Sequence, residues 1–192
     1  MPTLFINAVS SNAGGGLNDL VHTLPLLHQQ LGERGWDVEA WVAPQGDEEL
    51  RRTSAELPAL HVVCVNSPAH RARWELLTFP RIVRRRRPTA VFHFSNLIFR
   101  PSHPPQITVL RSSTFYSEKY AAQRRTSAYL ALRFAVGRRF AVKTIHWADR
   151  IFCISESHRD DIVRTVGSAA SKVKVSYPGL TRPDSAASLR KA

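Results

Sequence analysis

The sequence predicts an α/β protein built on a doubly wound parallel sheet with helices on both faces. Short apolar runs with β-branched residues alternate with helical patterns along the chain, which is the order expected when helices join parallel strands. The runs are mostly apolar, as in strands that are buried on both faces. The chain has no internal repeat, which favours an open sheet over a barrel. Its 192 residues suffice for one well-buried domain and are too few for two of ordinary α/β size.

Seven strands are expected, and helices are expected between them. The predicted strands are Leu4–Val9, Val38–Val42, His61–Val65, Ala90–Phe94, Ile107–Leu110, Arg150–Ile154 and a segment beginning at Val173. The predicted helices are one through Leu20, Leu24, Leu27 and Leu31 that Gly32 and Gly35 close, then Asp47–Leu57, Arg71–Arg87, Ser117–Trp147 and one after Ser155. Pro80 should kink or divide the helix in which it lies, because proline removes a hydrogen bond and crowds the preceding turn.

The segment Ala148–Gly179 carries the most information, because it contains a strand, a helix, a loop and a further strand in close succession. Ser155 stands where a helix N-cap belongs, and Asp160 and Asp161 lie in the early turns, where the helix dipole favours acidic residues. Gly167 is a suitable end for this helix.

This succession is similar to the end of the N-terminal domain of GT-B glycosyltransferases of the retaining, GT4-like family. In that family a segment of the type A-D-x-I-x-x-x-S-x-x-x-x-x-D-[IL] leads into K-V-x-V-x-x-x-G, and both patterns are present here. The resemblance extends from Leu4 to Leu180 as a succession of elements. It implies a Rossmann-like, acceptor-side domain, one half of a GT-B fold, in an enzyme that transfers a sugar from a nucleotide-sugar donor to a lipid-linked or glycan acceptor.

The resemblance also implies a second domain, which carries an E-x7-E motif that grips the donor. No counterpart of this motif follows Leu180, and residues 181–192 resemble a linker. We therefore expect one domain over residues 1–180, no C-terminal donor-binding domain, and no activity unless a partner chain supplies that domain. An exposed apolar cleft face is expected where the partner would dock.

A glycine-rich turn with Gly14, Gly15, Gly16 and Asn18 follows the first strand. In open α/β sheets this turn is the usual phosphate site, since glycines let backbone N–H groups approach an anion at the positive end of the next helix. It is neither G-x-G-x-x-G nor a P-loop. The resemblance implies that it borders the diphosphate and sugar of the donor; the alternative is a turn that binds nothing.

Three further residues are expected near the carboxyl ends of strands. His93 lies where the family often has P-D-x-[IV]-H-x-H and is a candidate catalytic residue; the alternative is a core histidine. Arg111 replaces a histidine common in the family. Arginine cannot act as a general base, but its planar fork suits phosphate or carboxylate, and the alternative is an exposed ion-pairing arginine. Ser155 is read first as an N-cap and second as a ligand-binding residue.

No metal site and no cofactor beyond the donor sugar nucleotide are expected. Cys64 and Cys153 lie in apolar runs and should be buried, and the sequence has no CxxC, HExxH or D-x-D motif. No secretory signal or membrane-spanning run is visible. These features favour a cytoplasmic protein, with a peripheral position at the inner face of the membrane as a further expectation.

The formal net charge of +12 indicates a surface that attracts anions. Arginine and lysine concentrate in Arg84–Arg87 and along the long helix that ends at Trp147. The alternative to a glycosyltransferase domain is a non-catalytic basic α/β module that binds an anionic membrane surface or a partner protein. Nucleic acid is the least expected partner, because no recognised nucleic-acid-binding motif accompanies the charge.

Overall fold

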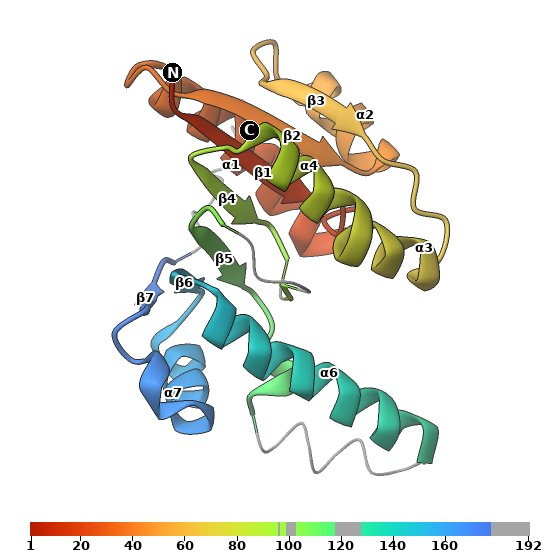
Figure 1. Ribbon diagram of the computed structural model, residues 1–192, viewed down its shortest axis with the longest axis vertical. Coiled ribbons are helices and arrows are strands. Elements are labelled where there is room, and N and C mark those ends of the chain that lie inside the picture. The colour runs from red at the N-terminus through yellow and green to blue at the C-terminus, as the bar shows by residue number, and fades with distance from the viewer. Residues whose placement is uncertain (96, 99–102, 118–127, 178–192) are drawn as a thin grey trace, which may run out of the picture.

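The computed structural model describes residues 1–95, 97–98, 103–117 and 128–177 (Figure 1). Its strands are β1 (Thr3–Ala8), β2 (Asp37–Val42), β3 (Ala59–Val62), β4 (Ala90–His93), β5 (Gln106–Leu110), β6 (Arg150–Cys153) and β7 (Val173–Val175). They form one sheet in the order β3-β2-β1-β4-β5-β6-β7, and each neighbouring pair is parallel. The chain therefore winds outward from β1 in both directions, and the predicted doubly wound parallel sheet is confirmed.

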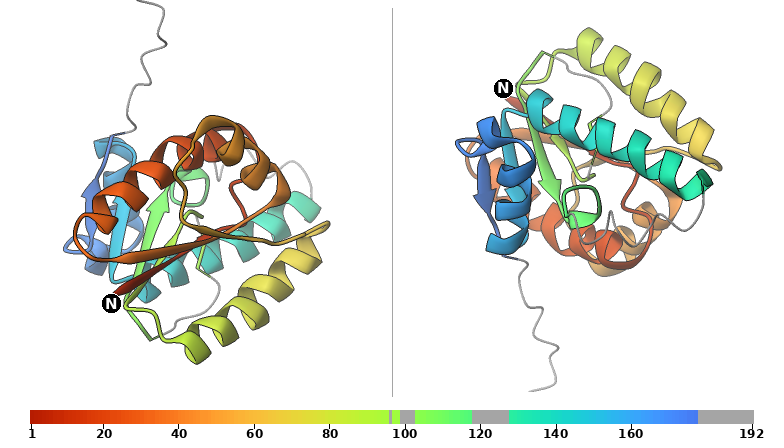
Figure 2. Two further views of the ribbon diagram at one scale, coloured as in Figure 1. Left: turned by 90° about the horizontal axis from the view of Figure 1, so that it is seen from above. Right: turned by 90° about the horizontal axis from the view of Figure 1, so that it is seen from below.

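The longer helices cover both faces of this sheet (Figure 2). They are α1 (Gly14–Gly32), α2 (Pro44–Thr53), α3 (Pro68–Arg73), α4 (Phe79–Arg86), α6 (Ala128–Trp147) and α7 (Glu156–Thr165). Right-handed crossovers put helices on opposite faces when the strand order reverses. Accordingly α1 lies on one side of the sheet, and α4 and α6 lie on the other.

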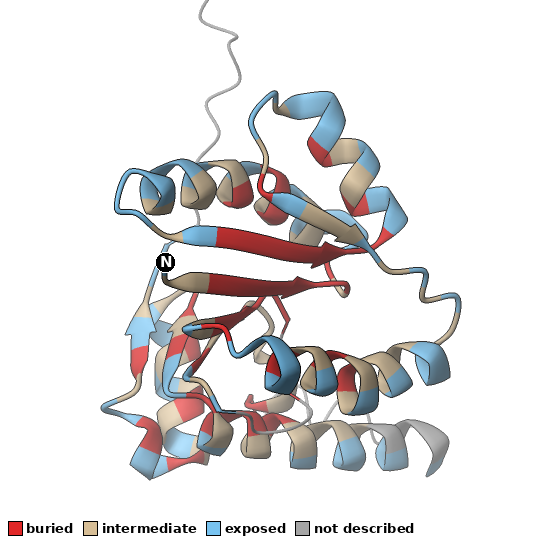
Figure 3. Cartoon of the chain, turned by 45° about the horizontal axis from the view of Figure 1, so that its top comes forward, coloured by how far each residue is buried: buried red, intermediate tan, exposed pale blue. Residues whose placement is uncertain are grey.

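Strand β1 shows how both faces are buried (Figure 3). Ile6 and Ala8 pack in a cluster with Leu20 and Leu24 of α1. Phe5 and Val9, which alternate with them, pack in a second cluster with Phe79 and Val83 of α4. A strand covered on both faces carries apolar residues on both, which explains why every residue of Leu4–Val9 except Asn7 is apolar.

The third strand begins two residues earlier and ends three residues earlier than predicted. The structure has β3 at Ala59–Val62 instead of His61–Val65, because its parallel partner β2 ends at Val42, opposite Val62. Cys64 therefore lies beyond the strand and is exposed, which corrects its predicted burial. Cys153 is buried, as predicted.

The helical region predicted at Arg71–Arg87 begins earlier, at Pro68, where the Ser67 hydroxyl accepts a hydrogen bond from the His70 N–H at 3.1 Å. A π-helical turn, η1 (Trp74–Thr78), separates α3 from α4. This turn ends two residues before Pro80, whose ring would clash with a carbonyl one turn back in a regular helix. The predicted interruption thus takes the form of a wider turn.

Two other helices also differ in extent from the prediction. Helix α2 spans Pro44–Thr53 instead of Asp47–Leu57, because Pro44 occupies a favoured first-turn position. The helix predicted from Ser117 to Trp147 is described as α6 from Ala128 onward; Ser117 itself is not helical, and residues 118–127 lie outside the described part. Residues 178–192, which include the expected tail, also lie outside it.

Candidate active site

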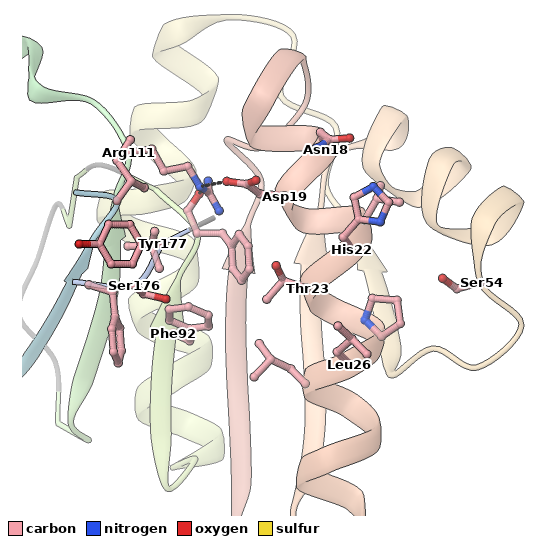
Figure 4. A pocket seen from close by; sticks show the side chains of 17 residues that line it. Asn18, Asp19, His22, Thr23, Leu26, Ser54, Phe92, Arg111, Ser176 and Tyr177 are labelled. Carbon is pink, nitrogen blue, oxygen red and sulfur yellow. Dashed lines mark hydrogen bonds and ion pairs between the residues drawn. The ribbon is translucent and has the colours of Figure 1, made fainter. Parts of the chain in front are cut away.

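An arginine and a helix N-terminus meet at the carboxyl edge of the sheet (Figure 4). Arg111 directly follows β5, and its Nε lies 2.8 Å from Oδ2 of Asp19 in the second turn of α1. Because β1 and β5 are parallel strands of one sheet, the residues after β5 and the helix after β1 emerge at the same edge. This edge is where ligands bind in open α/β sheets.

The Arg111 guanidinium contacts Phe94 as well as Asp19. Its Nη1 donates to the carbonyl oxygen of Phe94 at 3.4 Å, and its Cζ lies 4.8 Å from the centroid of the Phe94 ring. Burial lowers the pKa of Arg111, while the Asp19 carboxylate opposes this by raising it. Since the ordinary pKa of arginine lies far above neutrality, Arg111 stays charged and provides a fixed cation at this edge.

The three glycines form the first turn of α1 rather than a loop before it. Gly14 has a φ of +57°, the left-handed conformation that glycine adopts without strain. The N-cap residue Ala13 makes no side-chain cap, and the first turn has no acidic residue. The positive end of the helix dipole is therefore left without a neutralising side chain.

Gly16 lies beside Arg111. A Cβ placed on Gly16 would lie 3.8 Å from Nη1 of Arg111 and 3.7 Å from Cα of Ser11. The structure thus brings together two features that the sequence predicted separately, the glycine turn and the arginine after the fifth strand.

A groove of about 700 Å³ runs between α1 and strands β4 to β6. Arg111 and Asp19 face each other near one end of it, and the predicted residue Asn18 also lines it (Figure 4). The remaining wall is largely apolar. It includes Val21, Pro25, Leu26, Leu27, Phe92, Phe94, Val109, Phe152, Ile154 and Tyr177.

Arg111 and Ser155 both line a smaller hollow of about 110 Å³. The Ser155 hydroxyl accepts a hydrogen bond from the His158 N–H at 3.2 Å, so the predicted N-cap is present at the start of α7. His158 also lines this hollow, and burial lowers its pKa although Asp161 opposes the shift. Burial therefore disfavours the protonated form of His158, and Arg111 supplies positive charge to this hollow.

The structure places His93 on the opposite face of the sheet from the groove. Phe92 and Phe94 face the groove, while the His93 ring packs edge-on against Phe79 of α4 with centroids 6.0 Å apart. Its Nε2 lies 3.0 Å from Oε1 of Gln106, and burial lowers its pKa to about 4. The structure does not bring His93 together with Arg111, and this placement fits the alternative of a core histidine.

Two polar groups at this edge were not predicted from the sequence. Asp19 lies three residues after Gly16, on the same side of a helix, and that spacing could have indicated its proximity to the site. Glu75 of η1 is buried and accepts a hydrogen bond from Nδ2 of Asn7 at 2.6 Å. Burial raises the pKa of Glu75 to about 7, although Arg71 and Asn7 oppose the shift. Nothing in the local sequence signals that this glutamate is buried.

The described residues contain no group of three or more histidine, cysteine, aspartate or glutamate side chains that could hold a metal ion. Among these same residues, no helix has the length and apolar character that crossing a lipid bilayer requires.

Comparison with solved structures shows a related fold. The chain resembles the structure titled "lipopolysaccharide outer core galactosyltransferase WaaB apo form" with a TM-score of 0.54 and 13% identity, over 96% of this chain and 47% of that one. A structure titled "Crystal Structure Analysis of the Glycotransferase of kitacinnamycin" gives a TM-score of 0.49 and 13% identity, over 95% of this chain and 52% of that one. The chain thus spans about half the length of either structure.

Comparison at the sequence level gives the family. No curated protein matches the chain. The family model described as Glycosyltransferase Family 4 matches residues 20–181, which include Arg111 and Ser155 and begin just after the glycine turn. Since this match covers most of the chain, the protein belongs to Glycosyltransferase Family 4.

Proposed function

We propose that the chain is the acceptor-side, N-terminal domain of a retaining glycosyltransferase that moves a sugar from a nucleotide-sugar donor to a lipid-linked or glycan acceptor. The observation that carries this proposal is the meeting of Arg111 with the glycine turn of α1, at the mouth of the groove, in a chain of this family. Both features attract anions, and they lie on the edge of the sheet that binds ligands.

Arg111 and the first turn of α1 would act on the departing nucleoside diphosphate. When the bond between the sugar and the diphosphate breaks, negative charge grows on the phosphate oxygens. A guanidinium fixed by Asp19 and Phe94, together with backbone N–H groups at a helix N-terminus, stabilises such charge without reorganising. We propose that this charge is stabilised without a metal ion.

The donor site itself would come from a second domain. The apolar wall of the groove and the exposed side chains of Leu26 (58% exposed) and Tyr177 (68% exposed) offer the apolar face that docking of this domain requires. Both cysteines are free, Cys64 on the surface and Cys153 inside, which supports a cytoplasmic site of action.

The proposal is tested by sugar transfer from a panel of nucleotide sugars, with the companion domain present and released nucleoside diphosphate as the readout. We expect Arg111→Gln to abolish most of the transfer while thermal unfolding stays close to that of the parent. Arg164→Gln, which removes an exposed arginine of α7, serves as the control and should transfer normally. Equal activity of Arg111→Gln and the parent would contradict the proposed role of this edge.

A further inference from the structure

Helix α6 has a glycine near its middle, where alanine would make the helix more stable. Gly137 is that residue, and glycine in a helix interior is unfavourable because it loses the most conformational freedom on folding. Among the described glycines, Gly137 alone lacks room for a side chain. A Cβ placed on it would lie 2.7 Å from Cζ of Phe115, whereas a Cβ on any of the others would lie at least 3.5 Å from its neighbours. The glycine therefore has a steric reason at this position.

The ring of Phe115 occupies the space that this glycine leaves. Phe115 ends a short 3₁₀ turn, η2 (Ser113–Phe115), which begins two residues after Arg111. Phe134, about one turn before the glycine on α6, packs against Phe115 with ring centroids 5.9 Å apart. Phe115 also packs against the buried cluster that contains Leu110, the last residue of β5. The ring is thus held between α6 and the strand that leads into Arg111.

Tyr116 fixes the other end of this connection. Its side chain is buried, and its hydroxyl donates to the carbonyl oxygen of Ala141 on α6 at 3.4 Å. Its own carbonyl oxygen accepts a hydrogen bond from the Thr165 hydroxyl of α7 at 3.2 Å, and its N–H donates to the carbonyl oxygen of Ser113 at 2.9 Å. The connection after β5 is therefore clamped by two helices and has little freedom to absorb a shift of the Phe115 ring.

We propose that Gly137 is a positioning residue for Arg111 and acts through Phe115. The Arg111 guanidinium is oriented by other segments, since Nε lies 2.8 Å from Oδ2 of Asp19 on α1 and Nη1 donates to the carbonyl oxygen of Phe94 at 3.4 Å. Protein interiors are close-packed, so a side chain that displaces the Phe115 ring must move either α6 or the connection. Movement of the connection shifts the Arg111 backbone against these partners and turns the guanidinium away from the glycine turn of α1.

The first test is sugar transfer by Gly137→Ala with the companion domain present, and this arm rests on the proposed function. We expect kcat to fall by about tenfold to 10²-fold while KM stays close to that of the parent, because a misplacement of about 1 Å at a reacting centre costs up to about 10²-fold. Adding Phe115→Leu makes room for the new methyl group and should return kcat toward the parent value. Ala135→Gly, at an exposed position of the same helix, changes helix propensity without touching Phe115 and should transfer normally.

A second readout uses the full chain without a companion domain or a sugar nucleotide. In proton–nitrogen correlation spectra, the Nε–H of Arg111 should give a slowly exchanging resonance, because this side chain lies beside Asp19 and is only 16% exposed. Arg111→Gln identifies the resonance by removing it. Gly137→Ala should shift or broaden it, and the variant that combines Gly137→Ala with Phe115→Leu should restore it. Ala135→Gly should leave it in place.

An Arg111 resonance that is unchanged in Gly137→Ala would overturn the proposal, and so would a change that Phe115→Leu does not reverse. If Gly137→Ala fails to fold, Phe115→Ala decides, because it removes the same contact from the other side; an Arg111 resonance unchanged in that variant would also overturn the proposal. A parent protein that transfers no sugar would contradict the proposed function instead, and the resonance would still decide whether Gly137 positions Arg111.

Discussion

The role proposed for Arg111 depends on the orientation of its guanidinium as well as on its charge. Nε faces Asp19 while Nη1 reaches the Phe94 carbonyl, so the flat side chain is oriented by two partners at once. A lysine has one ammonium group on a flexible stem and cannot keep both contacts while presenting donors to a ligand.

We therefore predict that Arg111→Lys lowers kcat of the complete transferase by about 10²-fold to 10³-fold, the usual effect of removing one donor that stabilises developing charge. The measurement is steady-state transfer with the companion domain present. The effect should appear in kcat more than in KM, because the interaction strengthens as the diphosphate departs. A lysine variant with the kcat of the parent would mean that charge alone suffices at this position.

Glu75 makes stability depend on pH. Its folded pKa of about 7 lies above the ordinary value of 4.5, so the folded state holds this proton more tightly than the unfolded state does. The free energy of unfolding should therefore fall as pH rises from about 4.5 to about 7 and level off above that, by a total of about 3 kcal/mol from this group. His93 acts in the opposite sense between pH 6.5 and about 4, since burial lowers its pKa.

The Glu75→Gln variant separates the contribution of Glu75 to the pH dependence of stability from that of His93. Glutamine can still accept the Asn7 hydrogen bond but carries no charge at any pH. The variant should be more stable than the parent at pH 8, by up to about 3 kcal/mol, and nearly equal to it at pH 4.5. Denaturant unfolding at the two pH values measures this, and a constant difference between variant and parent would show that the Glu75 carboxyl does not titrate in this range.

At the scale of single elements, α1 has a weak start, because the side chain of its N-cap residue Ala13 makes no capping hydrogen bond. Gly16 adopts an ordinary helical conformation, and a Cβ there would make only normal van der Waals contacts with Ser11 and Arg111. Steric strain therefore does not require glycine at this position, which makes it suitable for a test of function.

Gly16→Ala should leave the protein as stable as the parent, or more stable by about 0.5–1 kcal/mol, because alanine favours the helix. The added methyl group should nevertheless narrow the approach of an anion to the first turn and to Arg111. We expect a several-fold loss of transfer with no loss of thermal stability. A variant that transfers normally would place the anion elsewhere.

Helix α7 depends on its cap. Ser155→Ala should lower the free energy of unfolding by about 1 kcal/mol, since the His158 N–H loses its acceptor. Ser155→Asn keeps a capping side chain and should restore stability. If Ser155 only caps the helix, the asparagine variant also transfers sugar normally; a stable asparagine variant that fails in transfer would assign Ser155 a ligand role.

At the scale of the whole molecule, the sheet could be predicted because it follows from local pattern. Strands buried on both faces need continuous apolar runs, and their alternation with helices leaves few topologies open. The edge strand β3 was misplaced because its end is set by the end of β2, which lies elsewhere in the sequence.

The site could be predicted only in part. The carboxyl-edge positions of Arg111, the glycine turn and Ser155 follow from strand order. The face toward which a strand side chain points changes with every residue, so a shift of one position decides whether His93 or Phe92 lines the groove. The pairing of Asp19 with Arg111 and the burial of Glu75 depend on contacts between segments far apart in the sequence, which no local pattern records.

The central claim is that this chain supplies the acceptor-side half of a sugar transferase. The most direct measurement is transfer from a panel of nucleotide sugars, first by the chain alone and then by the chain co-expressed with a donor-binding domain encoded next to it. We predict no turnover by the chain alone and turnover when both are present, lost again in Arg111→Gln. Turnover by the isolated chain, or none with a folded companion and a broad donor panel, would contradict the account.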